Sequence, residues 1–84
     1  MGRNKKKKYP VLKEDEKAIQ YKNEGKFKYV ALGPGIHVYD RKGKRRIGKD
    51  GIVQIQLMER VVYSTGKEYI VKEFGEKYVI LKEI

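Results

Sequence analysis

The strongest constraint on the fold is the alternation of short apolar runs with turn residues along most of the chain. Runs rich in Val, Ile and Tyr follow one another at roughly 8–12 residue intervals. They cover residues 26–32, 36–40, 45–48, 52–57, 60–64, 68–74 and 77–84. Short strands at this spacing, with turn signals between them, are typical of an all-β antiparallel chain.

Three of the turns share one pattern, in which a Tyr ends an apolar run and a Gly-Lys pair closes the turn a few residues later. These turns span residues 21–26, 39–44 and 63–67. Glycine takes the positive φ that hairpin loops need without steric cost. We therefore predict a hairpin at each of the three, with its Gly in the left-handed region.

The length of the chain limits the fold to one modest core. A chain of 84 residues buries only roughly 60–68% of its unfolded surface. Six or seven short strands must curl to bury one face, so we predict a small antiparallel meander or barrel, SH3-like or OB-like. We expect one β domain over residues 10–84, preceded by a disordered basic arm over residues 1–9.

Residues 11–24 allow two interpretations. Pro10 at a first helical position and acidic residues in the next turn suit a helix. Against this, apolar residues alternate on both sides of residues 23–26, as they do in a β-hairpin. We predict a short helical or irregular turn over residues 11–17, followed by a strand from about Ala18.

Two apolar segments in the second half of the chain carry further structural predictions. Residues 52–63 alternate clearly, which places on one face Val53, Ile55, Leu57, Val61 and Tyr63. The last hairpin is apolar on both faces, with Tyr69, Val71, Tyr78 and Ile80 on one and Ile70, Phe74, Val79 and Leu81 on the other. This indicates either a central position in a sandwich or a homodimer contact through the C-terminal hairpin.

The net charge of +10 is concentrated in two segments. Residues 1–8 carry +5 and residues 26–51 carry +6, whereas residues 9–25 carry −1 and residues 52–84 are neutral. Lysine-rich surfaces also keep proteins soluble, and a thermophile's composition would add Lys and Glu together. Neither explains a local excess of +6, so we predict a basic surface for a polyanionic partner.

Catalytic and metal-binding groups are scarce in this sequence. It has no Cys and one His, His37, which lies in a predicted strand. Asp40 and Asp50 flank the basic segment, where a turn Asp usually bonds its own backbone. We predict no enzyme activity, no cofactor and no metal site. No apolar run approaches a membrane span, so we expect a cytoplasmic or nucleoid-associated protein.

The basic segment 39–49 reads as a cationic hairpin. If residues 40–44 form its loop, basic side chains cluster at the tip and continue on the returning strand. Arg45 and Arg46 must point to opposite faces, so at most one of them shares the outward face of the loop. Such a ribbon suits the phosphates of a nucleic acid or its major groove, and nearby Tyr29 and Tyr39 allow base stacking.

The sequence thus predicts a non-catalytic nucleic-acid-binding protein, with DNA slightly favoured over RNA. The residues that we predict to bind are Lys5, Lys6, Lys7, Lys8, Lys26, Lys28, Tyr29, Tyr39, Arg41, Lys42, Lys44, Arg45, Arg46 and Lys49. The alternative is a protein–protein interaction module, such as a viral or plasmid-borne adaptor, that docks on an acidic protein partner and dimerises.

Overall fold

The computed structural model describes residues 10–84, which form one seven-stranded antiparallel sheet and no helix. The strands are β1 (Glu16–Glu24), β2 (Phe27–Ala31), β3 (His37–Tyr39), β4 (Ile52–Gln54), β5 (Arg60–Val62), β6 (Glu68–Phe74) and β7 (Tyr78–Glu83). Their order in the sheet is β3-β5-β6-β7-β1-β2-β4. The predicted all-β class with a small curled antiparallel sheet is confirmed.

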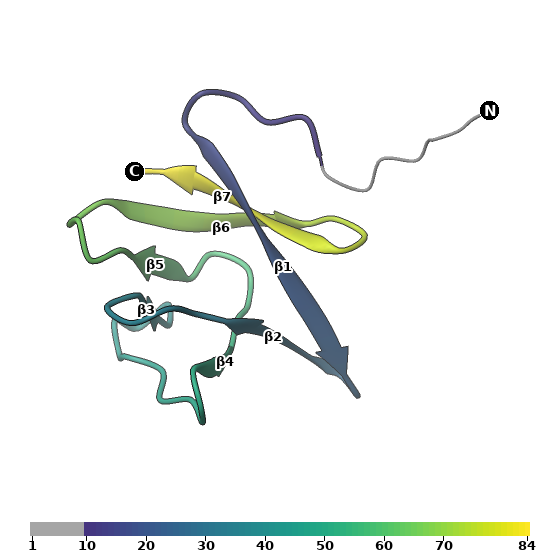
Figure 1. Ribbon diagram of the computed structural model, residues 1–84, viewed down its shortest axis with the longest axis vertical. Helices are drawn as coiled ribbons and strands as arrows, with labels where there is room; N and C mark the ends of the chain where they lie inside the picture. The colour runs from purple at the N-terminus through teal and green to yellow at the C-terminus, as the bar shows by residue number, and fades with distance from the viewer. Residues whose placement is uncertain (1–9) are drawn as a thin grey trace.

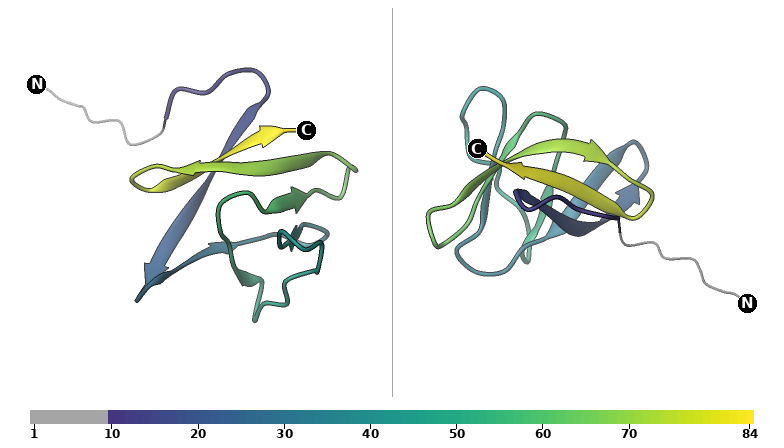
Figure 2. Two further views of the ribbon diagram at one scale, coloured as in Figure 1. Left: turned by 180° about the vertical axis from the view of Figure 1, so that it is seen from behind. Right: turned by 90° about the horizontal axis from the view of Figure 1, so that it is seen from above.

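The sheet curls because β1 is shared between its two halves. The first part of β1 pairs with β7 and the second part with β2, and Figure 1 shows β1 running diagonally between them. The edge strands β3 and β4 are connected by residues 40–51, which form hydrogen bonds with both. The Arg46 N–H donates to the Val38 carbonyl at 2.8 Å and the Lys49 N–H to the Ile52 carbonyl at 3.0 Å. The result is a nearly closed barrel (Figure 2).

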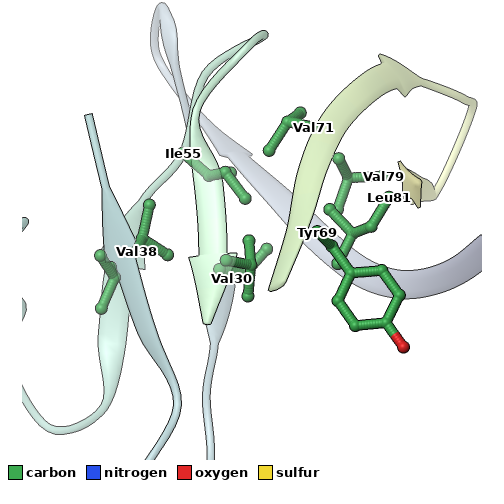
Figure 3. Packing of buried hydrophobic residues seen from close by; sticks show 9 residues of the cluster. Val30, Val38, Ile55, Tyr69, Val71, Val79 and Leu81 are labelled. Atoms are coloured by element: carbon green, nitrogen blue, oxygen red, sulfur yellow. The ribbon is translucent and has the colours of Figure 1, made fainter. Parts of the chain in front are cut away.

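The core fills the inside of this barrel with small apolar side chains from six of the strands and from the β4–β5 connection (Figure 3). Its buried members are Val30, Val38, Val53, Ile55, Val61, Tyr69, Val71, Val79 and Leu81. Two edge-to-face aromatic pairs lie at opposite ends of β6. Tyr21 meets Phe74 with ring centroids 5.2 Å apart, and Tyr63 meets Tyr69 at 5.3 Å.

The glycines of the three predicted turns take positive φ as predicted, although a single bridge between Tyr39 and Arg45 closes the turn at residues 39–44 in place of a two-stranded hairpin. Gly25, Gly43 and Gly66 have φ of 64°, 87° and 95°. The turns at Gly43 and Gly66 have the same hydrogen bonds, because each Gly N–H donates to the carbonyl three residues before it, at 2.9 and 2.8 Å. The two turns therefore share one backbone geometry, which begins at Asp40 in the first and at Tyr63 in the second.

The short helical or irregular turn predicted over residues 11–17 forms as an irregular turn without a helix. A turn at residues 14–15 precedes β1, which begins at Glu16. The Glu16 carboxylate accepts the Lys13 N–H at 2.9 Å, and the Glu16 N–H donates to the Lys13 carbonyl at 3.1 Å. Pairing of β1 with β7 extends the backbone from Glu16 onward, so the acidic residues close a turn instead of starting a helix.

The inner face predicted for residues 52–63 is confirmed in part: Val53, Ile55 and Val61 are buried and Tyr63 packs against the core, but Leu57 does not. A turn at residues 57–58 separates β4 from β5, and these strands lie far apart in the sheet order. Met58 has a φ of 68°, and Leu57 is 47% exposed instead of buried. The run at 45–48 forms no strand, only the single bridge between Tyr39 and Arg45.

The predicted faces of the C-terminal hairpin are wrong. The register between β6 and β7 shifts at a bulge between Val71 and Glu73, which brings Val71 opposite Leu81. Tyr69, Val71, Val79 and Leu81 consequently all belong to the core. A bulge inserts one residue on one strand and reverses the face of everything beyond it.

Candidate nucleic-acid interface

The basic hairpin, residues 39–46, is built on a turn that Asp40 organises. The Asp40 N–H donates to the Lys44 carbonyl at 2.8 Å. The Asp40 carboxylate accepts the N–H groups of Lys42 and Lys44, each at 2.9 Å. The hydrogen bond from the Lys44 N–H is the main cause that lowers the pKa of Asp40 below its ordinary value of 3.8. The loop's one acid therefore holds the backbone in place.

The base of the hairpin is fixed to the core by an ion pair between Arg46 and Glu59. Arg46 Nε lies 3.0 Å from both carboxylate oxygens, and Nη2 lies 2.6 Å from Oε2. The Glu59 side chain is 1% exposed and also accepts the Gln56 N–H at 3.0 Å. The hydrogen bond to Glu59 raises the pKa of Arg46. Arg46 is thus used inside the fold, whereas Arg45 is exposed, as strand geometry predicts.

Five exposed cations of this region have no ion-pair partner among residues 10–84. They are Arg41, Lys42, Lys44, Arg45 and Lys49. Apart from Arg46–Glu59, the ion pairs of the described chain lie in the half of the barrel formed by β1 and β5–β7. They are Arg60–Glu68, Lys67–Glu83, Lys72–Glu16 and Lys82–Asp15. Asp40 interacts electrostatically with Lys42 and Arg46, but six basic residues against this one acid leave residues 39–49 with a net charge of +5.

Tyr39 places an aromatic ring at the foot of this cationic loop. It pairs across the sheet with Arg60 on one side and bridges to Arg45 on the other. The Arg60 guanidinium carbon lies 5.7 Å from the centre of the Tyr39 ring, within the range of a cation–π contact. Because Val38 is buried, its neighbour Tyr39 points to the outside of the barrel. The hairpin thus combines free cations with one half-buried ring.

The predicted residues on β2 have different environments from one another. Lys28 lies on the same side as buried Val30, with its Nζ 5.3 Å from the centre of the Phe74 ring. Tyr29 points to the outside, where it pairs across the sheet with Lys22 and Gln54. Lys26 is exposed in the β1–β2 turn. Lys28 therefore points away from the outer surface on which Tyr29 lies.

The structure connects Tyr29 with the basic region through a groove. This groove has a volume of about 1290 Å³, and Tyr29 and Lys49 both line it. A smaller cleft of about 340 Å³ lies between residues 32–38 and residues 45–48. The predicted binding residues Lys5, Lys6, Lys7 and Lys8 lie outside the described residues.

Sequence reasoning missed Glu59, although a signal for it was present. Glu59 has the same parity as Val61 and Ile55, so the alternation that predicts their burial also places position 59 on the inner face. A charged residue at an inward position needs a charged or hydrogen-bonding partner. Arg46 is that partner, and it reaches Glu59 from a segment distant in the sequence.

Comparison with known protein families, characterised proteins and solved structures finds no match for this chain. Within the described part of the chain, no three His, Asp or Glu side chains gather so that they could hold a metal ion. The same residues contain no helix with the length and apolarity to cross a membrane.

Proposed function

We propose that the protein is a non-catalytic nucleic-acid-binding module that contacts phosphates through the basic hairpin and Lys49. DNA is the favoured partner over RNA, and the lysines at residues 5–8 add further charge. The observation that carries this proposal is the group of five exposed cations without an ion-pair partner among residues 10–84.

The geometry of the hairpin supports this use of its charges. The Asp40 turn and the Arg46–Glu59 pair fix the backbone that carries the cations. A surface that is ordered before binding loses less conformational freedom when the partner docks. The two free arginines can form bidentate contacts to phosphate, whereas the lysines act as point charges.

The first experiment is a titration of labelled duplex DNA at several salt concentrations. If about five phosphates are neutralised, the logarithm of affinity falls with the logarithm of salt at a slope of about −4.5. Binding with a slope near zero contradicts the proposal, because contacts to phosphate release counterions.

The second experiment removes the charges of the hairpin and compares a variant of equal net charge. The hairpin variant carries R41A, K42A, K44A and R45A; the control carries K13A, K67A, K77A and K82A. Both lower the net charge from +10 to +6. Arg46 is left intact because its loss would leave Glu59 buried without a partner. We expect the slope of the logarithm of affinity against the logarithm of salt to become shallower by about 3–4 in the hairpin variant. The slope of the control should stay close to that of wild type. An equal change of slope in both variants would contradict an interface located at the hairpin.

A further inference from the structure

The groove beside the basic hairpin has a floor of polar and apolar side chains that includes Tyr29. Strands β1, β2 and β4 form this floor with the side chains that point away from buried Val30 and Val53. Across the sheet Lys22, Tyr29 and Gln54 lie in one row, and Ala31 and Ile52 lie in the next. Residues 46–50 also line the groove, and they directly continue the basic hairpin. We call this feature the β2 groove.

Two rings on this face differ from the other aromatic residues of the barrel. Tyr21, Tyr63, Tyr69 and Phe74 pair with one another, and Tyr39 meets Arg60. Tyr29 and Phe27 make no ring or cation contact within residues 10–84. Phe27, which continues the face beyond the groove, is 50% exposed, and Ile52 in the floor is 48% exposed. Flat apolar surface is therefore available along β2.

Charged residues of both signs line the groove. Lys22 lines it in the row of Tyr29, and Lys49 lines it from the segment that continues the hairpin; both are exposed and without an ion-pair partner in the described chain. Glu24 and Asp50 also line it, so the groove itself has little net charge. The positive charge increases from Lys49 toward the hairpin, which directs a polyanion along this path.

We infer that the β2 groove binds the unstacked bases of a single-stranded nucleic acid while the basic hairpin holds its phosphates. The inference rests on the proposed function and names its substrate class. A duplex presents phosphates outward and keeps its bases stacked, so it would leave the Tyr29 floor unused. A single strand presents both groups, and its bases stack on exposed rings regardless of sequence. The Gln54 amide can bond to the edge of a base.

The test compares a single strand with a duplex on the same variants. The probes are labelled oligothymidylate of 16 nucleotides, the upper end of about 4–16 nucleotides per small barrel, and a duplex of equal length. Fluorescence anisotropy is measured for wild type, Y29L, Y29F and the hairpin variant. Y29L removes the ring and keeps apolar bulk, and Y29F keeps the ring. Circular dichroism confirms that each variant is folded.

We expect Y29L to weaken binding of oligothymidylate about tenfold, with the duplex unchanged and Y29F close to wild type. The hairpin variant should bind both probes more weakly than wild type. If Y29L binds oligothymidylate as wild type does, or binds both probes equally weakly, the groove inference is overturned. In that case, weaker binding of both probes by the hairpin variant still supports the proposed function. If the hairpin variant binds both probes as wild type does, the proposed function fails as well.

Photocrosslinking locates the bound bases directly. Oligothymidylate with 5-iodouracil substitutions is crosslinked to the wild-type protein, and the adduct is mapped by mass spectrometry. Trypsin releases Tyr29 and Tyr39 on one peptide, residues 29–41, so fragment spectra must separate them. Adducts on Tyr29 or Phe27 support the inference, and adducts confined to Tyr39 overturn it. A homodimer that buries this groove, detected by sedimentation and abolished by I52K, also overturns it.

Discussion

Glu59 shows how a single residue links the interior to the candidate interface. Its side chain is 1% exposed, and its carboxylate neutralises Arg46 at the base of the basic hairpin. A buried charge whose partner is removed is strongly destabilising, whereas a well-packed apolar replacement of both partners is often tolerated. The pair therefore makes the position of the hairpin depend on the packing of the core.

Replacing Arg46 alone should reveal this dependence. We expect R46L to lower the free energy of unfolding by about 3 kcal/mol, because Glu59 is left buried without its counter-charge. R46L with E59L should recover part of this loss, although the Gln56 N–H then lacks its acceptor. Urea unfolding measures both.

The matched control for R46L is R60L, which breaks the Arg60–Glu68 pair. The side chains of Arg60 and Glu68 are 41% and 42% exposed. The expected loss in the free energy of unfolding is therefore about 0–1 kcal/mol. Equal losses for R46L and R60L would show that burial of Glu59 has no special role.

At the scale of the elements, Glu16 links β1 to β6 across β7. Its side chain is 6% exposed and accepts a hydrogen bond from Lys72 Nζ at 2.8 Å. This bond, followed by that from the Lys13 N–H, lowers the pKa of Glu16 below 4.5. A carboxylate whose pKa is lowered by folding stabilises the fold above its unfolded pKa, and this stabilisation is lost as pH falls through the folded value.

We therefore expect wild type to exceed E16Q in stability at about pH 6 and the difference to shrink toward about pH 3. Urea midpoints across this range measure the difference directly. A difference that is constant with pH would mean that the Glu16 charge does not contribute.

Gly48 is required where the segment joining β3 to β4 passes close to β4. A methyl group there would overlap the Ile52 carbonyl oxygen and lie 2.6 Å from Val53 Cγ2. We expect G48A to displace this segment and lower the melting temperature. G43A is the control, because its strain comes from a φ of 87° in open space and costs about 1–2 kcal/mol. A melting temperature for G48A equal to that of wild type would contradict the close approach.

The elements show which parts of the fold local sequence can predict. The turns at Gly43 and Gly66 depend on residues within five positions, so the local sequence was sufficient. The bulge at residues 71–73 depends on how β7 packs against β6, and no local signal marks it. The same limit applies to the candidate site. The exposed cations of the loop can be predicted from the charge pattern and the turn residues, but the ion pair between Arg46 and Glu59 depends on a contact between residues distant in the sequence.

At the scale of the whole molecule, the net charge is divided between residues 1–8, which carry +5, and residues 26–51, which carry +6. The hairpin cations stand on a backbone fixed by Asp40 and by the Arg46–Glu59 pair, at set distances from one another. Charges that are fixed before binding lose little conformational freedom when the partner docks. The number of charges alone therefore does not rank the contributions of the two segments.

Deleting residues 1–8 tests this ranking. The deletion removes a charge of +5, one more than the four charges that the hairpin variant removes. We nevertheless expect the deletion to weaken binding of nucleic acid less than the hairpin variant does, measured by anisotropy at one fixed salt concentration. A greater loss on deletion would assign the main phosphate contacts to the first eight residues, and the fixed hairpin would then be secondary.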